Sequence, residues 1–154
     1  MNDYMSRMEE LEKHPHAHKM FKDIAAGNEH VYNFLWAMWN FEHAFDDLID
    51  IGPPKDDQSK ELVFKALAKF IDCLLTNPFV KTYADDLRAM MISTMTRCLD
   101  GDKAEAKGDP KAPAIRCGDV DLVMHVAYLH RGWDYMRSLN ALRIYDKPDK
   151  ELTK

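Results

Sequence analysis

The sequence has few of the features that mark secreted, membrane-spanning or thiolate-metal proteins. Its three cysteines, Cys73, Cys98 and Cys117, are an odd number without CxxC or CxxH spacing. We therefore expect reduced, mostly structural thiols in a cytoplasmic protein. The sequence has no run of 18 apolar residues, and its first segment, MNDYMSRMEELEK, is polar. We accordingly expect neither a transmembrane helix nor a secretory leader.

Several common catalytic and binding motifs are also missing. The sequence contains no P-loop, no GxGxxG and no GxSxG, so it lacks the usual signatures of phosphate loops, dinucleotide folds and serine hydrolases. Its formal net charge is -5. Since binding to a phosphate backbone is driven by basic residues, we do not expect nucleic acid as a partner.

What the sequence does contain is helical periodicity. Nothing alternates with period two over more than a few residues, which argues against strands. The length of 154 residues suits one domain. We predict an all-α, single-domain bundle (residues 1–154) of about five principal helices. Its expected parts are short N-terminal helices within 1–27, a central helix within 28–51, a long loop over 101–117 and a frayed tail over 146–154.

Helix boundaries follow from proline, glycine and capping residues. His14 and Pro15 suit the cap and first position of a short helix, and Asn28 suits the cap of the central one. Gly52 and two prolines end the central helix, and a further helix starts near Asp56. Along that helix we expect these residues on the buried side: Leu62, Phe64, Leu67, Phe70, Ile71 and Leu74. Asn77 and Pro78 then open a helix that reaches about Leu99, and Asp119 caps the last long helix.

One acidic cluster breaks the local rules for helices. Glu42, Asp46, Asp47 and Asp50 crowd the C-terminal end of the central helix. Each like-charge pair at i,i+3 or i,i+4 costs about 0.2–0.5 kcal/mol, and the helix dipole disfavours each nearby anion by a further ~0.3–1 kcal/mol. A bound Mg²⁺ would reverse the sign of this penalty, because magnesium prefers carboxylate oxygens. We therefore predict a metal site at these four residues.

The simpler interpretation is that these acids form a solvated helix end, with Lys55 offsetting some of the repulsion. Bulky apolar residues interleaved with the acids favour the metal interpretation, because a purely solvated face rarely carries them. These residues are Trp39, Phe41 and Phe45.

Residues 45–50, FDDLID, resemble the aspartate-rich DDxxD motif of class I isoprenoid synthases. In that family the motif ends a helix that lines an all-α cavity, where it binds magnesium ions that hold and ionise an allylic diphosphate. The resemblance implies that Asp46 and Asp50 are metal ligands. It also implies aromatic contacts to the apolar tail or carbocation from Trp39, Phe41 and Phe45.

In size the chain is also similar to all-α nucleotide pyrophosphohydrolases, which pair ExxE on one helix with ExxD on another to bind magnesium. Glu9 and Glu12 have the first spacing, and Asp47 and Asp50 have the second. This resemblance implies metal-assisted hydrolysis of a phosphoanhydride.

The last long helix carries further candidates. Asp121 and His125 are four residues apart, so they can form a carboxylate–imidazole pair that faces the acidic cluster and acts as a general base, or a structural hydrogen bond. Arg131 and Arg137 are candidate phosphate-binding residues.

Three histidines lie close together near the N-terminus, at His14, His16 and His18. Because Pro15 disturbs the helical placement that would bring two of them together, we expect a solvated segment there.

Two functions remain open at this stage. The favoured one is a Mg²⁺-dependent enzyme that acts on a diphosphate-bearing or nucleotide substrate. The alternative is a non-enzymatic helical binding, inhibitor or adaptor protein, oligomeric in the simplest case. It is suggested by tryptophans and tyrosines in excess of one core stripe, because such residues anchor interfaces. Only the enzyme hypothesis predicts that magnesium raises the melting temperature.

Overall fold

The computed structural model describes residues 14–50 and 52–140. Every regular element in that part is a helix, which confirms the all-α prediction. Five of these helices have eleven residues or more, as predicted: α2 (Pro15–Ala25), α3 (Glu29–Asp50), α4 (Asp57–Thr76), α6 (Ala84–Ala106) and α8 (Gly118–Arg131). Three short helices accompany them: α5 (Pro78–Thr82), α7 (Ala112–Arg116) and α9 (Trp133–Ser138).

The chain divides into two compact helical units, with the division between Lys81 and Thr82. The first unit contains α2, α3 and α4, and the second contains α6, α7, α8 and α9. The part of the predicted N-terminal helices that falls within residues 1–13, and the predicted frayed tail over 146–154, lie outside the described residues. Among the helices that are described, none combines the length and the apolarity that a membrane span requires.

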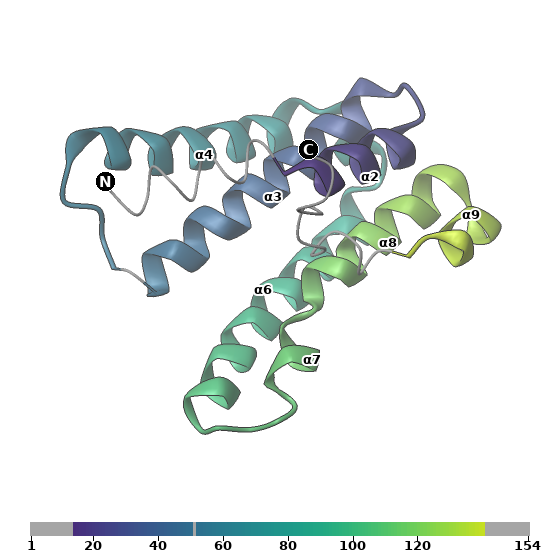
Figure 1. The fold of residues 1–154 in the computed structure, drawn as a ribbon. Coiled ribbons are helices and arrows are strands. Elements are labelled where there is room, and N and C mark those ends of the chain that lie inside the picture. The colour runs from purple at the N-terminus through teal and green to yellow at the C-terminus, as the bar shows by residue number, and fades with distance from the viewer. Residues whose placement is uncertain (1–13, 51, 141–154) are drawn as a thin grey trace, which may run out of the picture. The chain divides into compact units, whose positions relative to one another are not determined.

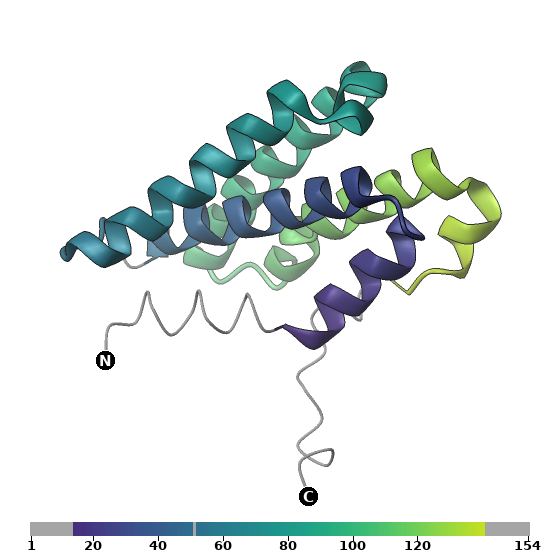
Figure 2. The same ribbon diagram turned by 90° about the horizontal axis from the view of Figure 1, so that it is seen from above.

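The first unit is a helical hairpin of α3 and α4, with α2 packed on α3 (Figures 1 and 2). Its helices begin at the predicted caps. His14 Nδ1 accepts from the Ala17 amide at 3.3 Å, Asn28 Oδ1 accepts from the His30 amide at 3.0 Å, and Asp56 Oδ1 accepts from the Ser59 amide at 2.8 Å. Each cap satisfies a backbone donor that the first helical turn leaves without a partner.

The core of the first unit is built by α2 and by one side of α3. Almost no surface remains exposed on these residues: Phe21, Ile24, Val31, Phe34 and Leu35. On α3, Val31, Phe34 and Leu35 begin an apolar stripe with helical spacing. Towards the C-terminal end of α3 the stripe comes out of the core, since Phe45 is 46% exposed and Ile49 is 49% exposed.

The second unit places α6 against α7 and α8 (Figure 1). Thr94 Oγ1 donates to the Gly118 carbonyl oxygen at 3.0 Å, which joins the middle of α6 to the start of α8. A Cβ on Gly118 would lie 3.0 Å from Thr94 Cα, so the absence of a side chain permits this close approach.

The structure corrects several predicted boundaries. The long loop over 101–117 is wrong, because α6 continues to Ala106 and α7 follows at Ala112. Small residues pack there in place of large apolar ones, and Gly101 and Ala104 are both buried. The helix expected from Pro78 to Leu99 is interrupted at Tyr83. The last long helix begins at Gly118, so Asp119 lies in its first turn and does not cap it.

The burial predicted along α4 is wrong for three of the six residues. Phe70 is buried as expected, but Phe64 is 69% exposed, Leu67 is 38% exposed and Ile71 is 47% exposed. The residues that face the core lie on the other side of the helix: Ser59, Ala66, Phe70 and Cys73. Two apolar stripes therefore run along α4, and the described residues cover only one of them.

Candidate functional site

The predicted acidic cluster lies in the last turns of α3. Asp47 is 4% exposed, whereas Asp46 beside it and Glu42 are partly exposed. Adjacent helical positions point about 100° apart, so Asp47 is directed to the buried side while Asp46 is not. The side chain of Asp50 lies outside the described residues.

The described part of the chain contains no group of three histidine, cysteine or acidic side chains close enough to hold a metal ion. Glu42, Asp46 and Asp47 therefore do not form a metal site by themselves. The four-residue site that includes Asp50 stays a prediction.

Two of the three aromatic residues expected at a substrate are used in packing. Trp39 is 4% exposed, and its ring lies 6.0 Å from that of Phe21 on α2. Phe41 stacks on Phe70 of α4, with 4.3 Å between ring centroids. Phe45 is the most exposed of the three. None of them lines the pocket described below.

Histidines and aromatic rings cluster where α2 meets α3. The His18 ring stacks on Trp36 with 4.1 Å between centroids, and a 2.8 Å hydrogen bond joins its Nδ1 to the Tyr32 hydroxyl. His43 lies 4.2 Å from the Trp39 ring and donates from Nδ1 to the Trp39 carbonyl oxygen. The expectation of a solvated histidine segment is therefore wrong.

His14 belongs to the same cluster. Its burial lowers the pKa of the imidazole below the ordinary value of 6.5, and the positive charges that His16, His43 and His18 can carry lower it further. The cluster therefore favours a neutral His14, the form whose Nδ1 caps α2.

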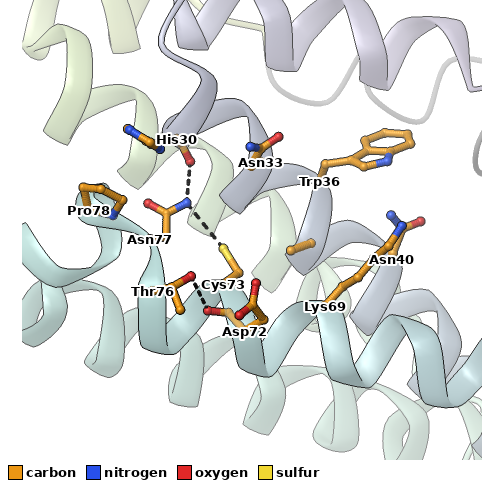
Figure 3. A pocket seen from close by; sticks show the side chains of 11 residues that line it. His30, Asn33, Trp36, Asn40, Lys69, Asp72, Cys73, Thr76, Asn77 and Pro78 are labelled. Atoms are coloured by element: carbon orange, nitrogen blue, oxygen red, sulfur yellow. Dashed lines mark hydrogen bonds between the residues drawn. The ribbon is translucent and has the colours of Figure 1, made fainter.

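A pocket of about 570 Å³ opens between α3 and α4 (Figure 3). From α3 it is lined by His30, Asn33, Trp36, Ala37 and Asn40; from α4 and the following turn it is lined by Lys69, Asp72, Cys73, Thr76, Asn77 and Pro78. This volume is in the range that small-molecule sites occupy. Its exposed Lys69 and Asp72 side chains offer one charge of each sign.

Asn77 closes one end of the pocket. Its Nδ2 donates to the His30 carbonyl oxygen at 2.8 Å and to Cys73 Sγ at 3.5 Å, and its Oδ1 accepts from the Phe79 amide at 2.9 Å. Burial raises the pKa of the Cys73 thiol, the charge of Asp72 raises it further, and the Asn77 contact opposes this only in part. Cys73 is therefore a protonated structural thiol and not an activated nucleophile.

Asn40 and Lys69 both lie on the pocket wall (Figure 3). The Asn40 Oδ1 is buried and accepts no hydrogen bond from the residues that the structure describes. A buried amide oxygen of this kind favours a donor from a bound ligand or water. Chemically, the pocket can hydrogen-bond a small polar molecule.

The candidate pair Asp121 and His125 lies on α8, in the second unit, while the acidic cluster lies in the first. Asp121 forms an ion pair with Arg97 of α6, whose Nη2 also donates to the Ala114 carbonyl oxygen at 2.9 Å. His125 Nε2 is buried and has no hydrogen-bond partner among the described residues. Instead of the expected carboxylate–imidazole pair, the structure has a guanidinium–carboxylate pair, which is the stronger, charge-assisted interaction.

Each of the two arginines predicted to bind phosphate lies over an aromatic ring. The Arg131 guanidinium lies 4.0 Å from the centroid of the Tyr135 ring, and that of Arg137 lies 5.9 Å from the centroid of Trp133. Each arginine thus stacks on a different ring.

No family model matches the chain, and no curated protein or solved structure matches it either.

Sequence reasoning missed the most distinctive surface of the first unit. Four apolar residues lie exposed along one side of α4: Phe64, Leu67, Ile71 and Leu75. We call them the α4 apolar face. Their spacing of three, four and four residues was visible in the sequence, but a periodic stripe does not say whether another element covers it.

Proposed function

We propose that the protein is a helical binding module that presents apolar helix faces to polypeptide partners. The observation that carries this proposal is the α4 apolar face, on which Phe64 is 69% exposed and Leu75 is 68% exposed. Exposed apolar side chains that are contiguous, and not scattered singly, mark interaction surfaces. Anchors at i, i+3 and i+7 are the pattern by which one helix recognises another.

The second unit carries a similar surface on α6. Ile92 is 60% exposed, Met95 is 43% exposed and Leu99 is 50% exposed, again at spacings of three and four. We call them the α6 apolar face. The buried residues of α6, which include Leu87 and Thr94, point to the opposite side. With one such face in each unit, the chain suits an adaptor that engages two partner surfaces.

A labelled amphipathic peptide tests the proposal directly. The probe is a fluorescent 20-residue helix of leucine, glutamate and lysine, and its fluorescence anisotropy is titrated with the full chain. Replacing Phe64 and Leu75 together by serine should weaken binding by about tenfold, because two exposed anchors are lost. Glu61→Ser, on an exposed polar position of the same helix, is the matched control. Unchanged affinity of the double variant would refute the proposal.

A magnesium-dependent role in handling a diphosphate or a nucleotide phosphate is the second candidate. It is supported by the burial of Asp47 on the same helix end as Glu42 and Asp46. Removing a carboxylate from water is costly. A cation shared with Asp50 would offset it.

The test of this second candidate is a thermal-shift series with magnesium, alone and with nucleotides or isoprenyl diphosphates. A saturated site should raise the melting temperature by about 5–10 °C. Asp46→Asn combined with Asp50→Asn should abolish that rise and any metal-linked hydrolysis. Glu61→Gln should leave both unchanged. A melting temperature that does not respond to magnesium and these ligands would rule this candidate out.

A further inference from the structure

We infer that the α4 apolar face binds the same face of a second copy of this chain, with the two α4 helices antiparallel. This inference rests on the proposed function and names the partner of the face. An isologous dimer requires a surface that is complementary to itself under a two-fold rotation. The α4 helix meets that requirement in both its apolar and its charged residues.

The apolar residues pair with one another in a single register. Consider two antiparallel helices related by a two-fold axis, and take one residue from each copy at every contact. The two residue numbers then add up to about the same value at each contact along the helices. A sum of about 138 sets Phe64 opposite Leu75 of the second copy and Leu67 opposite its Ile71. All four side chains are exposed in the described chain, so the pairing would cover each of them. Ala68, exposed near the centre of this register, leaves room for close approach of the two helices.

The charged residues beside the face fit the same register. Lys65 and Asp72 lie seven residues apart on one flank of the α4 apolar face, and both are exposed. In the antiparallel pairing Lys65 lies opposite Asp72 of the second copy, and the two-fold axis repeats this contact. Within the described residues neither side chain takes part in an ion pair. Opposite charges that meet across an interface fix its register and orientation.

Sedimentation equilibrium on the full chain over a wide concentration range tests the inference. The wild-type chain should form a reversible dimer. Ile71→Glu should raise the dissociation constant at least about tenfold, since it places a charge within the apolar contact. Ile92→Glu introduces the same charge on the α6 apolar face, at a similarly exposed position, and should leave the dimer unchanged. Circular dichroism checks that both variants remain helical.

A charge-exchange experiment tests the register itself. Lys65→Glu alone and Asp72→Lys alone should each weaken the dimer, because each creates two like-charge contacts. A mixture of the two single variants should form a heterodimer at wild-type strength, because every contact is then between opposite charges. The double variant, K65E with D72K, should also recover. A parallel pairing or an unrelated interface would show no such recovery, and that result would overturn the inference.

The remaining outcomes separate this inference from the proposed function. A chain that stays monomeric at all concentrations but binds the amphipathic probe through Phe64 and Leu75 overturns the dimer and leaves the binding face intact. A chain that neither dimerises nor binds the probe overturns both. A dimer weakened by Ile92→Glu and not by Ile71→Glu overturns the assignment to α4.

Discussion

At the scale of single residues, the N-terminal cap of α2 depends on the protonation state of the His14 imidazole. The cap on α2 needs a lone pair on Nδ1, since this atom accepts from the Ala17 amide. Burial, together with His16, His43 and His18, lowers the pKa of His14. A histidine whose pKa is lower in the folded than in the unfolded state opposes protonation of the folded chain. Its contribution to stability is therefore lost as the pH falls.

We expect the free energy of unfolding to decrease as the pH falls from about 7.5 through the ordinary histidine pKa of 6.5. The unfolded state binds the proton more tightly than the folded state in this window, so acid favours unfolding. His14→Asn should flatten the pH dependence, because asparagine caps a helix without titrating. The measurement is urea unfolding at several pH values, with His30→Asn at an exposed site as control. An unchanged slope in the His14 variant would contradict this account.

Cys73 has a raised pKa because its thiol is buried. We expect the Cys73 thiol to react much more slowly with a disulfide reagent at pH 8 than the thiols of Cys98 and Cys117. Cys98 and Cys117 are partly exposed, whereas Cys73 combines burial with little thiolate. Labelling kinetics with identification of the modified peptides would check this order. Asn77→Ala removes the contact to Cys73 Sγ and should slow its reaction further, provided that the turn stays folded.

At the scale of elements, the contact of α6 with α8 depends on a single missing side chain. Gly118→Ala should lower the free energy of unfolding by about 1–3 kcal/mol, the usual cost of overpacking. Its Cβ would meet Thr94 Cα at 3.0 Å and the Thr94 carbonyl oxygen at 3.2 Å. Both are backbone atoms, so no rotation of a side chain relieves the clash. Ser93→Ala on an exposed position of α6 is the control, and chemical denaturation is the measurement.

Truncating a side chain on the buried face of α4 should lower the free energy of unfolding far more than truncating one on the α4 apolar face. Phe70→Ala should cost about 3–5 kcal/mol of stability, because Phe70 is 7% exposed and stacks on Phe41. Phe64→Ala should change the stability of the monomer by less than about 0.5 kcal/mol, since Phe64 lies in solvent. Denaturation of dilute protein measures both. A large loss from Phe64→Ala would mean that the α4 apolar face is covered within the chain.

Capping and breaking residues predicted the starts of α2, α3, α4 and α5 correctly because their action is local. The Asn28 and Asp56 side chains contact amides two or three residues away, so the sequence neighbourhood suffices. The segment after Leu99 could not be predicted in this way. Its glycine and alanine form helix because small residues allow α7 to lie against α6, and that is a tertiary effect.

The candidate site was predicted less well, for a similar reason. The charge pattern of residues 42–50 does not say that Asp47 is directed into the core, because this direction depends on how α3 packs. The partner of Asp121 is Arg97, 24 residues earlier in the chain. No spacing rule within one helix predicts such a contact.

At the scale of the whole molecule, stability and association should be linked. A partner that binds only folded chains raises the melting temperature by mass action. If α4 pairs with a second copy, a hundredfold increase in protein concentration should raise the melting temperature by about 3–5 °C. The Ile71→Glu variant should melt at one temperature across that range, and Ile92→Glu should follow the wild-type chain. Differential scanning calorimetry at several concentrations measures this. A wild-type melting temperature independent of concentration would show that the folded chain gains nothing from a second copy, and the exposed residues of α4 would then require a different polypeptide to cover them.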